Sequence, residues 1–439
     1  MSEADTRNSH IRFWIIGVLF VVSSINYASR ATFSFATVPL QNEIGLTAVQ
    51  IGYIFSAFGW SYVAGQVPGG ALLDRYGSRP VYLWSIFLWS VFTLLQAYVT
   101  WISVVPVMIS LFLLRLLLGV SESPSFPANA RIVANWFPHA ERGTASAIFN
   151  ASQYFSLVAF APLMGWLAEH HGWRSVFWSM GLIGLAAVVL FWVVVDSPAR
   201  HKWISKKEYD FIEKNGALVN LDKPADKPQP IRWSSVGQLL KNRMLLGIYL
   251  AQYCITALTY FFATWFPIYL IQARGMSLTV AGFAAAGPAI AGFVGGILGG
   301  VLSDLLLKRG MPLSQARKTV IVLGLIISCG ILGANYTNSQ GLVLMFMTIA
   351  FFGKGVAALG WAVMSDAAPR EATGLSGAIF NLFGNAAGIF TPIGIGYILA
   401  ATGNNWDMAL VFVFAHSIVA MISYGFITGE IKRVVLRAD

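Results

Sequence analysis

The sequence contains few charged side chains. Asp, Glu, Lys and Arg make up 11% of its 439 residues, whereas apolar residues make up 56%. Soluble domains carry about a quarter charged residues. The composition therefore excludes an ordinary soluble domain and predicts an integral membrane protein that crosses the bilayer many times.

Cysteine is also scarce. The chain has two cysteines, Cys254 and Cys329, and both fall inside apolar runs. We expect packed free thiols rather than a disulfide. We also expect no cleavable signal, because residues 1–12 are polar and the apolar run after them is too long for a signal peptide.

Motifs of several enzyme classes are missing. No glycine-rich phosphate loop precedes a lysine, so the sequence indicates no ATP-driven mechanism. No cluster of His, Cys and carboxylates has metal-ligand spacing, and no convincing Ser, His and Asp set is present. We expect neither an enzyme nor a cofactor or metal.

What the sequence does contain is apolar runs long enough to span a bilayer, in two groups of six. The first group covers about 13–37, 49–73, 80–99, 105–133, 143–168 and 175–196. The second covers about 245–272, 277–306, 318–337, 341–365, 374–401 and 405–429. We expect an all-α integral membrane protein with twelve transmembrane helices in two six-helix bundles, 1–196 and 245–439.

A polar segment, 197–244, separates the two groups and is rich in lysine. Within it, Ser205 and Glu208 have the spacing of a capping box that opens a short amphipathic helix. A proline-containing linker follows at 224–230. We expect this segment to lie in the cytoplasm.

The positions of the basic residues give the orientation. With a cytoplasmic N-terminus, 23 of the 29 Lys and Arg lie at cytoplasmic ends or loops, and four lie within helices. Only Arg174 and Arg274 then lie outside. This bias predicts that both termini are cytoplasmic. It also explains the net charge of +10 without a nucleic-acid partner.

An internal repeat supports the division into halves. Gly70 and Asp74 recur 230 residues later as Gly300 and Asp304. Pro138 and the segment AIFN also recur, 231 residues later. Two matches at nearly one offset indicate two duplicated, pseudo-symmetric bundles, and parallel halves around a midplane site are typical of transporters.

Two ionisable residues share one apolar run. Arg115 and Glu122 are seven residues apart, almost two helical turns, so both face the same side. A charge facing lipid costs at least ~2.5 kcal/mol, so this side faces protein or a water-filled cavity. One interpretation is a buried structural ion pair. The other is a site for protons and anions, since burial favours the neutral form of Glu122.

Two more cations lie within predicted helices. Arg30 suits a substrate carboxylate, and the alternative is pairing with Glu122 or with backbone carbonyls. Lys354 is either a second carboxylate ligand, which would favour a diacid, or a counter-ion of Glu122. Arg115 is the alternative second cation, or a group that tunes Glu122.

Polar side chains at membrane depth suit a polyhydroxylated substrate. They are Tyr62, Gln66, Asn150, Gln153, Trp361, Asn381 and Asn385. The alternative for each is a hydrogen bond between helices. Gly292, Gly296 and Gly300 recur every four residues, which predicts close helix contact along that face.

Several motifs resemble a known family. GALLDRYGSR at 70–79, with a weaker echo at 300–309, resembles the signature loop of the major facilitator superfamily. NYASRAT at 26–32, SESPSFPANARIVANWFPHAERG at 121–143 and FFGKGVAALGW at 351–361 are similar to its anion:cation symporters for sugar acids, the galactarate, glucarate and galactonate permeases. The resemblance covers nearly the whole chain.

This resemblance implies proton-coupled symport of an aldarate or aldonate by alternating access in a bacterial inner membrane, by a functional monomer. It implies that Arg30 binds the substrate carboxylate, that Glu122 couples protons, and that Asp74, Arg75, Arg79 and Asp304 form the inner gate. The residues that match substrate-contacting positions are Tyr27, Tyr62, Gln153, Trp361 and Asn381.

One departure concerns proton coupling. The family has an aspartate immediately before the arginine of the first helix, where this chain has Ser29. A dianion needs two protons for electroneutral entry, and Ser29 removes one acceptor. The alternatives are an anion exchanger or a permease for another small carboxylate. A membrane sensor is a further alternative, but the central segment is too small for an output domain.

Overall fold

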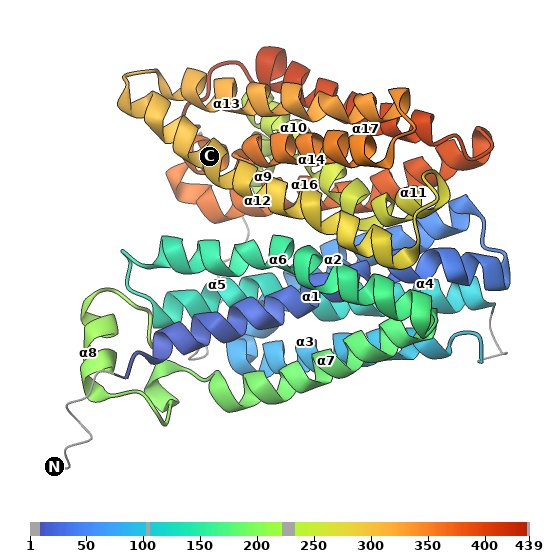
Figure 1. Ribbon diagram of the computed structural model, residues 1–439. Helices are drawn as coiled ribbons and strands as arrows, with labels where there is room; N and C mark the ends of the chain where they lie inside the picture. The colour runs from blue at the N-terminus through green and yellow to red at the C-terminus, as the bar shows by residue number, and fades with distance from the viewer. Residues whose placement is uncertain (1–8, 102–105, 222–232, 437–439) are drawn as a thin grey trace. The chain divides into compact units, whose positions relative to one another are not determined.

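The computed structural model describes residues 9–101, 106–221 and 233–436, and within these ranges it contains helices and no strand. The proline-containing linker predicted at 224–230 lies outside the described residues. Each of the twelve predicted runs coincides with a long helix or with a helix that is broken once (Figure 1). The prediction of an all-α membrane fold is confirmed.

The helices of the first half begin and end close to the predicted runs. They are α1 (Ile11–Ile44), α2 (Ala48–Tyr76), α3 (Ser78–Leu95), α4 (Val107–Glu122), α5 (Ser125–Trp136), α6 (Arg142–His170) and α7 (Trp173–Val194). Two short helices, α8 (Lys206–Lys214) and α9 (Trp233–Lys241), follow in the central segment.

The second half repeats the pattern. Its helices are α10 (Arg243–Thr264), α11 (Phe266–Gln272), α12 (Leu278–Lys308), α13 (Leu313–Ser328), α14 (Gln340–Val356), α15 (Gly360–Ala367), α16 (Thr373–Ala401) and α17 (Trp406–Ile422). The short 3-10 segments are Gln96–Tyr98, Pro198–Arg200, Cys329–Tyr336 and Arg370–Ala372, and a π-helical turn covers Ser423–Ile427.

Eleven stretches of the described chain are long and apolar enough to cross a membrane, and α2 is not one of them. Its length of 29 residues is ample for a span. Glycines and polar residues, including Tyr62 and Gln66, lower its hydropathy. A helix that contributes polar side chains to a protein interior is expected to have a lower mean hydropathy, because only part of its surface meets lipid.

Helices α4 and α14 each end in the middle of a predicted span, next to a charged residue. Helix α4 ends at Glu122, where the Ser123 amide donates to the Val120 carbonyl (3.2 Å) in a tightened turn before Pro124. Helix α14 ends at Val356, two residues after Lys354. Discontinuous helices are typical of substrate sites in transporters, because they free backbone groups at membrane depth.

Contacts divide the chain into two compact units. Unit 1 comprises Met1–Thr32, Trp60–Phe160 and His171–Gln229. Unit 2 comprises Phe33–Gly59, Ala161–His170 and Pro230–Asp439. Parts of α1, α2 and α6 thus belong to unit 2, where the Ser34 hydroxyl donates to the Thr264 carbonyl (2.5 Å). The predicted boundaries of 1–196 and 245–439 stay a prediction.

Glycines allow α12 and α14 to pack at backbone distance in unit 2. A Cβ on Gly295 would lie 2.3 Å from the Phe352 carbonyl oxygen, and one on Gly299 would lie 2.4 Å from that of Val356. A Cβ on Gly300 would meet nothing within 4 Å. The prediction that Gly292, Gly296 and Gly300 form the contact face is therefore wrong at Gly300. The glycines that meet α14 are Gly292, Gly295 and Gly299, whose spacing of three and then four residues follows one side of a straight helix.

The central segment contacts the start of α1 within unit 1. Ser205 caps α8 as predicted, because its hydroxyl accepts from the Glu208 amide (3.2 Å). The Glu208 carboxylate does not complete the capping box. It accepts instead from the Ile11 amide (2.8 Å) at the start of α1, beside which α8 lies in Figure 1. The two cysteines are free, as predicted.

Candidate functional site

Arg30 and Glu122 form an ion pair inside unit 1. The Nε of Arg30, on α1, lies 2.7 Å from Oε2 of Glu122, the last residue of α4. The Glu122 side chain is 0% exposed, whereas the Arg30 side chain is 20% exposed. Of the predicted partners of Arg30, Glu122 is the one that it contacts here, and the role in binding substrate stays a prediction. The Glu122 carboxylate is fully buried, while the Arg30 side chain is partly exposed.

Two neighbours on α1 complete the polar surroundings of the pair. The Ser29 hydroxyl donates to Oε1 of Glu122 (2.9 Å), and the Asn26 side-chain oxygen accepts from a terminal nitrogen of Arg30 (2.9 Å). Both side chains are buried. Asn26 was not singled out from the sequence, although it lies one helical turn before Arg30 on the same face. Ser29 stands where the resembled family has an aspartate, and its hydroxyl contacts the carboxylate of Glu122.

Two aromatic rings flank the guanidinium of Arg30. Its central carbon lies 4.8 Å from the centroid of the Tyr27 ring and 4.8 Å from that of the Tyr62 ring. Such cation–π contacts orient the planar group without using its N–H donors. The structure therefore brings together four residues that were predicted separately, namely Tyr27, Arg30, Tyr62 and Glu122.

Arg115 binds the backbone of α1. Its two terminal nitrogens donate to the carbonyl oxygen of Arg30, at 3.2 and 3.3 Å. Its side chain is buried, almost two helical turns before Glu122 on α4. The predicted alternative of a structural Arg115–Glu122 pair stays a prediction. Arg115 places a second positive charge close to the site.

The remaining predicted cation lies in unit 2. Lys354 is only 6% exposed, and its ammonium lies 5.1 Å from the centroid of the Phe351 ring one turn earlier on α14. Trp361, on α15, is 54% exposed and packs edge-to-face on Phe380, with ring centroids 4.9 Å apart. A buried ammonium and an exposed indole give this unit both a charged and an aromatic group.

Amide side chains form a hydrogen-bonded row in unit 2. The Asn385 amide donates to the Asn381 side-chain oxygen (3.1 Å), and the Tyr260 hydroxyl donates to the Asn385 oxygen (3.4 Å). Gln252, which donates to the Thr256 hydroxyl (3.2 Å), was missed from the sequence. An amide in the middle of the apolar run 245–272 is the signal that could have identified it.

Helix α6 contributes two amides to unit 1. The Asn150 amide donates to the Ser146 carbonyl (2.8 Å), and the Gln153 amide donates to the Asn150 carbonyl (3.3 Å). Both side chains use backbone acceptors of their own helix. The predicted role of Gln153 in binding substrate stays a prediction.

The predicted gate residues form ion pairs within single units. Asp74 pairs with Arg131, and Arg79 pairs with Asp196 (2.8 Å), all in unit 1. In unit 2, Arg317 bridges Asp304 (3.2 Å) and Asp366 (3.1 Å). Arg75 lies over the ring of the adjacent Tyr76. The family role of these residues in an interdomain gate stays a prediction.

No group of three or more metal-ligating side chains occurs in the part of the chain that the structure describes. What the arrangement can do chemically follows from the Arg30 pair. An arginine side chain that is partly exposed and paired with a buried carboxylate is a suitable contact for an anion.

Comparisons with known proteins show the family of this chain. Residues 19–392 match the model of the Major Facilitator Superfamily. The chain is 51% identical over 434 residues to "Probable galactarate/D-glucarate transporter GudP" of Escherichia coli K12, covering 98% of this chain and 96% of that protein. The corresponding protein of Bacillus subtilis is 53% identical, with 98% and 95% covered. "D-galactonate transporter" of Escherichia coli O6:H1 is 40% identical, with 96% and 97% covered.

Solved structures share the fold. A D-xylose–proton symporter matches with a TM-score of 0.71 at 15% identity, covering 95% of this chain and 98% of that one. A bacterial homolog of the lysosomal transporter Spinster also matches with a TM-score of 0.71 at 15% identity, with 94% and 96% covered. The chain belongs to the major facilitator superfamily and is a multi-span membrane transporter related to sugar-acid transporters, not an enzyme.

Proposed function

We propose that this protein imports a sugar-acid anion together with protons, by alternating access, across the inner membrane of a bacterium. The substrates that its relatives' names suggest are aldarates such as galactarate and D-glucarate, with aldonates such as galactonate as the related class. The observation that carries the proposal is the Arg30–Glu122 ion pair (2.7 Å), in which a partly exposed arginine side chain is held by a buried carboxylate.

Coupling follows from competition for one guanidinium. A substrate carboxylate that binds Arg30 bidentately displaces Glu122, which then remains in a buried position without its cation. An unpaired buried charge costs several kcal/mol, so Glu122 takes up a proton. Protonation of Glu122 in turn releases Arg30 for the substrate. Proton and anion therefore increase each other's affinity by the same factor, as linkage requires.

The predicted polar residues of each unit suit a polyhydroxylated substrate. Tyr27 and Tyr62 hold the guanidinium plane, while the amides of Asn381 and Gln153 offer both donors and acceptors to hydroxyls. Lys354 is the proposed ligand of a second carboxylate, which favours a diacid. Alternating access is supported by the internal repeat and by the membership of the superfamily.

Uptake by reconstituted protein tests this function. Proteoliposomes are supplied with labelled galactarate, glucarate, galactonate and an unhydroxylated dicarboxylate such as adipate, at several external pH values and with an inward proton gradient. The expected result is accumulation of a sugar acid that rises as external pH falls and collapses with a protonophore. Equal uptake of adipate, or no response to the proton gradient, would contradict the proposal.

A further inference from the structure

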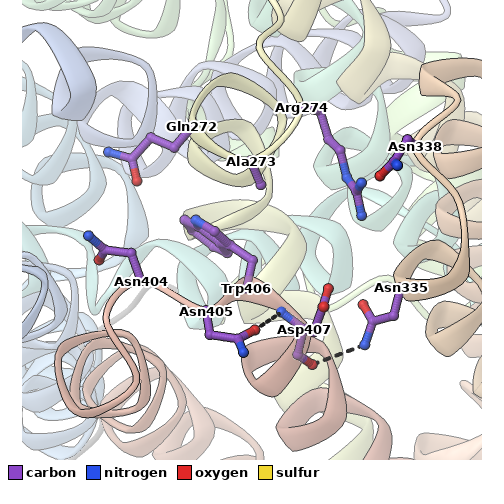
Figure 2. Close-up of a pocket in the computed structure, with 9 residues that line it drawn as sticks. All are labelled: Gln272, Ala273, Arg274, Asn335, Asn338, Asn404, Asn405, Trp406 and Asp407. Carbon is purple, nitrogen blue, oxygen red and sulfur yellow. Dashed lines mark hydrogen bonds between the residues drawn. The ribbon is translucent and has the colours of Figure 1, made fainter.

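A polar hollow lies in unit 2, and its lining residues do not include Arg30 or Glu122. Its volume is about 570 Å³, within the range of small-molecule sites. It is formed by the end of α11, the residues after it, the segment 335–338 and the start of α17. Figure 2 shows Trp406 in the middle of the lining, with Gln272 and Asn404 on one side and Arg274, Asn335 and Asn338 on the other.

We propose that this hollow is a second binding site, for a polyhydroxylated carboxylate, on the outer face of the protein. The chemistry rests on the substrate class of the proposed function, but the site is separate from the transport site. Arg274 is one of only two basic residues that the charge distribution assigns to the outside.

Arg274 is held in a fixed position by neutral oxygens. Its Nε donates to the Tyr269 hydroxyl (2.8 Å), and its terminal nitrogens donate to the carbonyls of Thr337 (3.0 Å) and Ala334 (2.7 Å). These acceptors orient the guanidinium without neutralising it. Each terminal nitrogen carries two N–H groups, so the fork can accept a carboxylate in addition.

The other lining residues recognise hydroxyl groups. Asn404 has a left-handed backbone (φ 64°), and Asn405 caps α17 by accepting from the Asp407 amide (2.9 Å). Asp407 also lines the hollow, and its carboxylate accepts from sugar hydroxyls. Trp406 is held against Tyr269, with ring centroids 5.6 Å apart. The combination selects an anion with hydroxyls over a plain dicarboxylate.

The hollow is joined to the helix that carries the transport arginine. The Gln272 amide donates to the side-chain oxygen of Gln41 (2.8 Å), and Gln41 lies eleven residues after Arg30 on α1. Both Gln272 and Gln41 belong to unit 2. Occupancy of the hollow therefore acts on the outer end of α1, which makes it a site for regulation or capture of the substrate.

Equilibrium binding of labelled D-glucarate to the purified full chain in nanodiscs tests the proposal. Wild-type protein is expected to bind in two phases. Arg30→Ala removes the transport site and should retain one phase, and adding Arg274→Gln should weaken that phase by about tenfold, as the loss of a charge-assisted pair implies. Arg174→Gln, at the other outer arginine, is the matched control and should leave both phases unchanged.

Since Arg274 also binds the backbone, Asp407→Asn provides a second test. It should raise the relative affinity of the retained phase for adipate over glucarate, because only glucarate has hydroxyls that the Asp407 carboxylate can accept from. Absence of any binding by Arg30→Ala, with wild-type uptake intact, would overturn the second site alone. Absence of wild-type uptake would instead overturn the proposed function.

Discussion

Glu122 and Lys354 lie one residue away from corresponding positions in the two halves of the chain. The repeat offset of 231 aligns Glu122 with Gly353 and Ser123 with Lys354. Glu122 is the last residue of α4, and Lys354 lies in the last turn of α14. Helix C-termini carry partial negative charge, which favours the ammonium and disfavours the carboxylate. Glu122 is therefore the residue that depends on a cation from another helix, and Arg30 of α1 lies 2.7 Å from it.

Replacement of Glu122 by Gln tests its role in coupling. The amide keeps an acceptor for Ser29 and Arg30 but cannot carry a proton. We expect uphill accumulation to be lost while counterflow of labelled substrate persists. Substrate affinity should fall with rising pH in the wild type and stay flat in Glu122→Gln, because protonation no longer releases Arg30. Unchanged uphill uptake by the variant would remove Glu122 from the mechanism.

Replacement of Ser29 by Asp tests the consequence of the family departure. The Ser29 hydroxyl lies 2.9 Å from Oε1 of Glu122, so an aspartate there would place two carboxylates in contact. Such a pair titrates as a unit and holds a proton more readily than either group alone. We expect one more proton per substrate, measured from the reversal potential of uptake. Ser29→Asn has a similar shape and is the control; the same gain with Asn would exclude titration as its cause.

Replacement of Lys354 by Asn tests the assignment of a second carboxylate site. The variant should lose about tenfold or more in affinity for galactarate, because a charge-assisted contact is removed, but much less for galactonate. Competition binding against the two acids gives both values. Lys308→Asn, at the exposed end of α12, is the control for a general loss of positive charge. Equal losses for diacid and monoacid would exclude Lys354 from the site.

The twelve spans could be predicted because each is apolar over the full width of a bilayer, whether its side chains face lipid or the protein interior. Arg30, Glu122 and Lys354 could be predicted as well, since an ionisable group within such a run has few harmless explanations. The pairing of Arg30 with Glu122 was only one of two alternatives. It depends on the packing of α1 against α4, and no periodicity in one helix specifies its neighbour.

Contacts made by polar groups in loops were harder to predict. Ser205 and Glu208 had the spacing of a capping box, and Ser205 does cap α8. Glu208 binds α1 instead, which is 197 residues away from it in sequence. Similarly, the signature loop singled out Asp74 and Arg79. Nothing in the local sequence identifies Arg131 and Asp196 as their partners. Long-range partners of charged side chains require the fold.

Replacement of Gly355 by Ala tests the backbone contact between α12 and α14. A Cβ at this position would lie 2.2 Å from the Gly292 carbonyl oxygen, which cannot move without shifting the helix. We expect a loss of stability of about 1–3 kcal/mol, as for overpacking elsewhere, seen as a lower melting temperature in detergent. Gly300→Ala has open space around it and should be neutral or stabilising, since Ala favours helix. Equal effects would mean that the contact contributes nothing.

Replacement of Glu208 by Gln tests how the central segment is fixed to unit 1. The carboxylate is 0% exposed and accepts from the Ser9 hydroxyl (2.6 Å), the Ile11 amide (2.8 Å) and the Arg12 guanidinium (3.2 Å). It thereby caps the free N–H groups at the start of α1, where negative charge is favourable.

Gln would lose the charge and point an NH₂ group at one of these donors, leaving buried Arg12 with a weaker partner. Breaking a buried pair costs roughly 3–5 kcal/mol, so we expect a melting temperature lower by several degrees. Glu213→Gln, on the exposed face of the same helix, should have no such effect. Transport below the melting transition should stay close to wild type, because the Glu208 carboxylate contacts the start of α1 and is not part of the Arg30 pair. A variant that melts normally but transports poorly would instead assign Glu208 to the transport cycle.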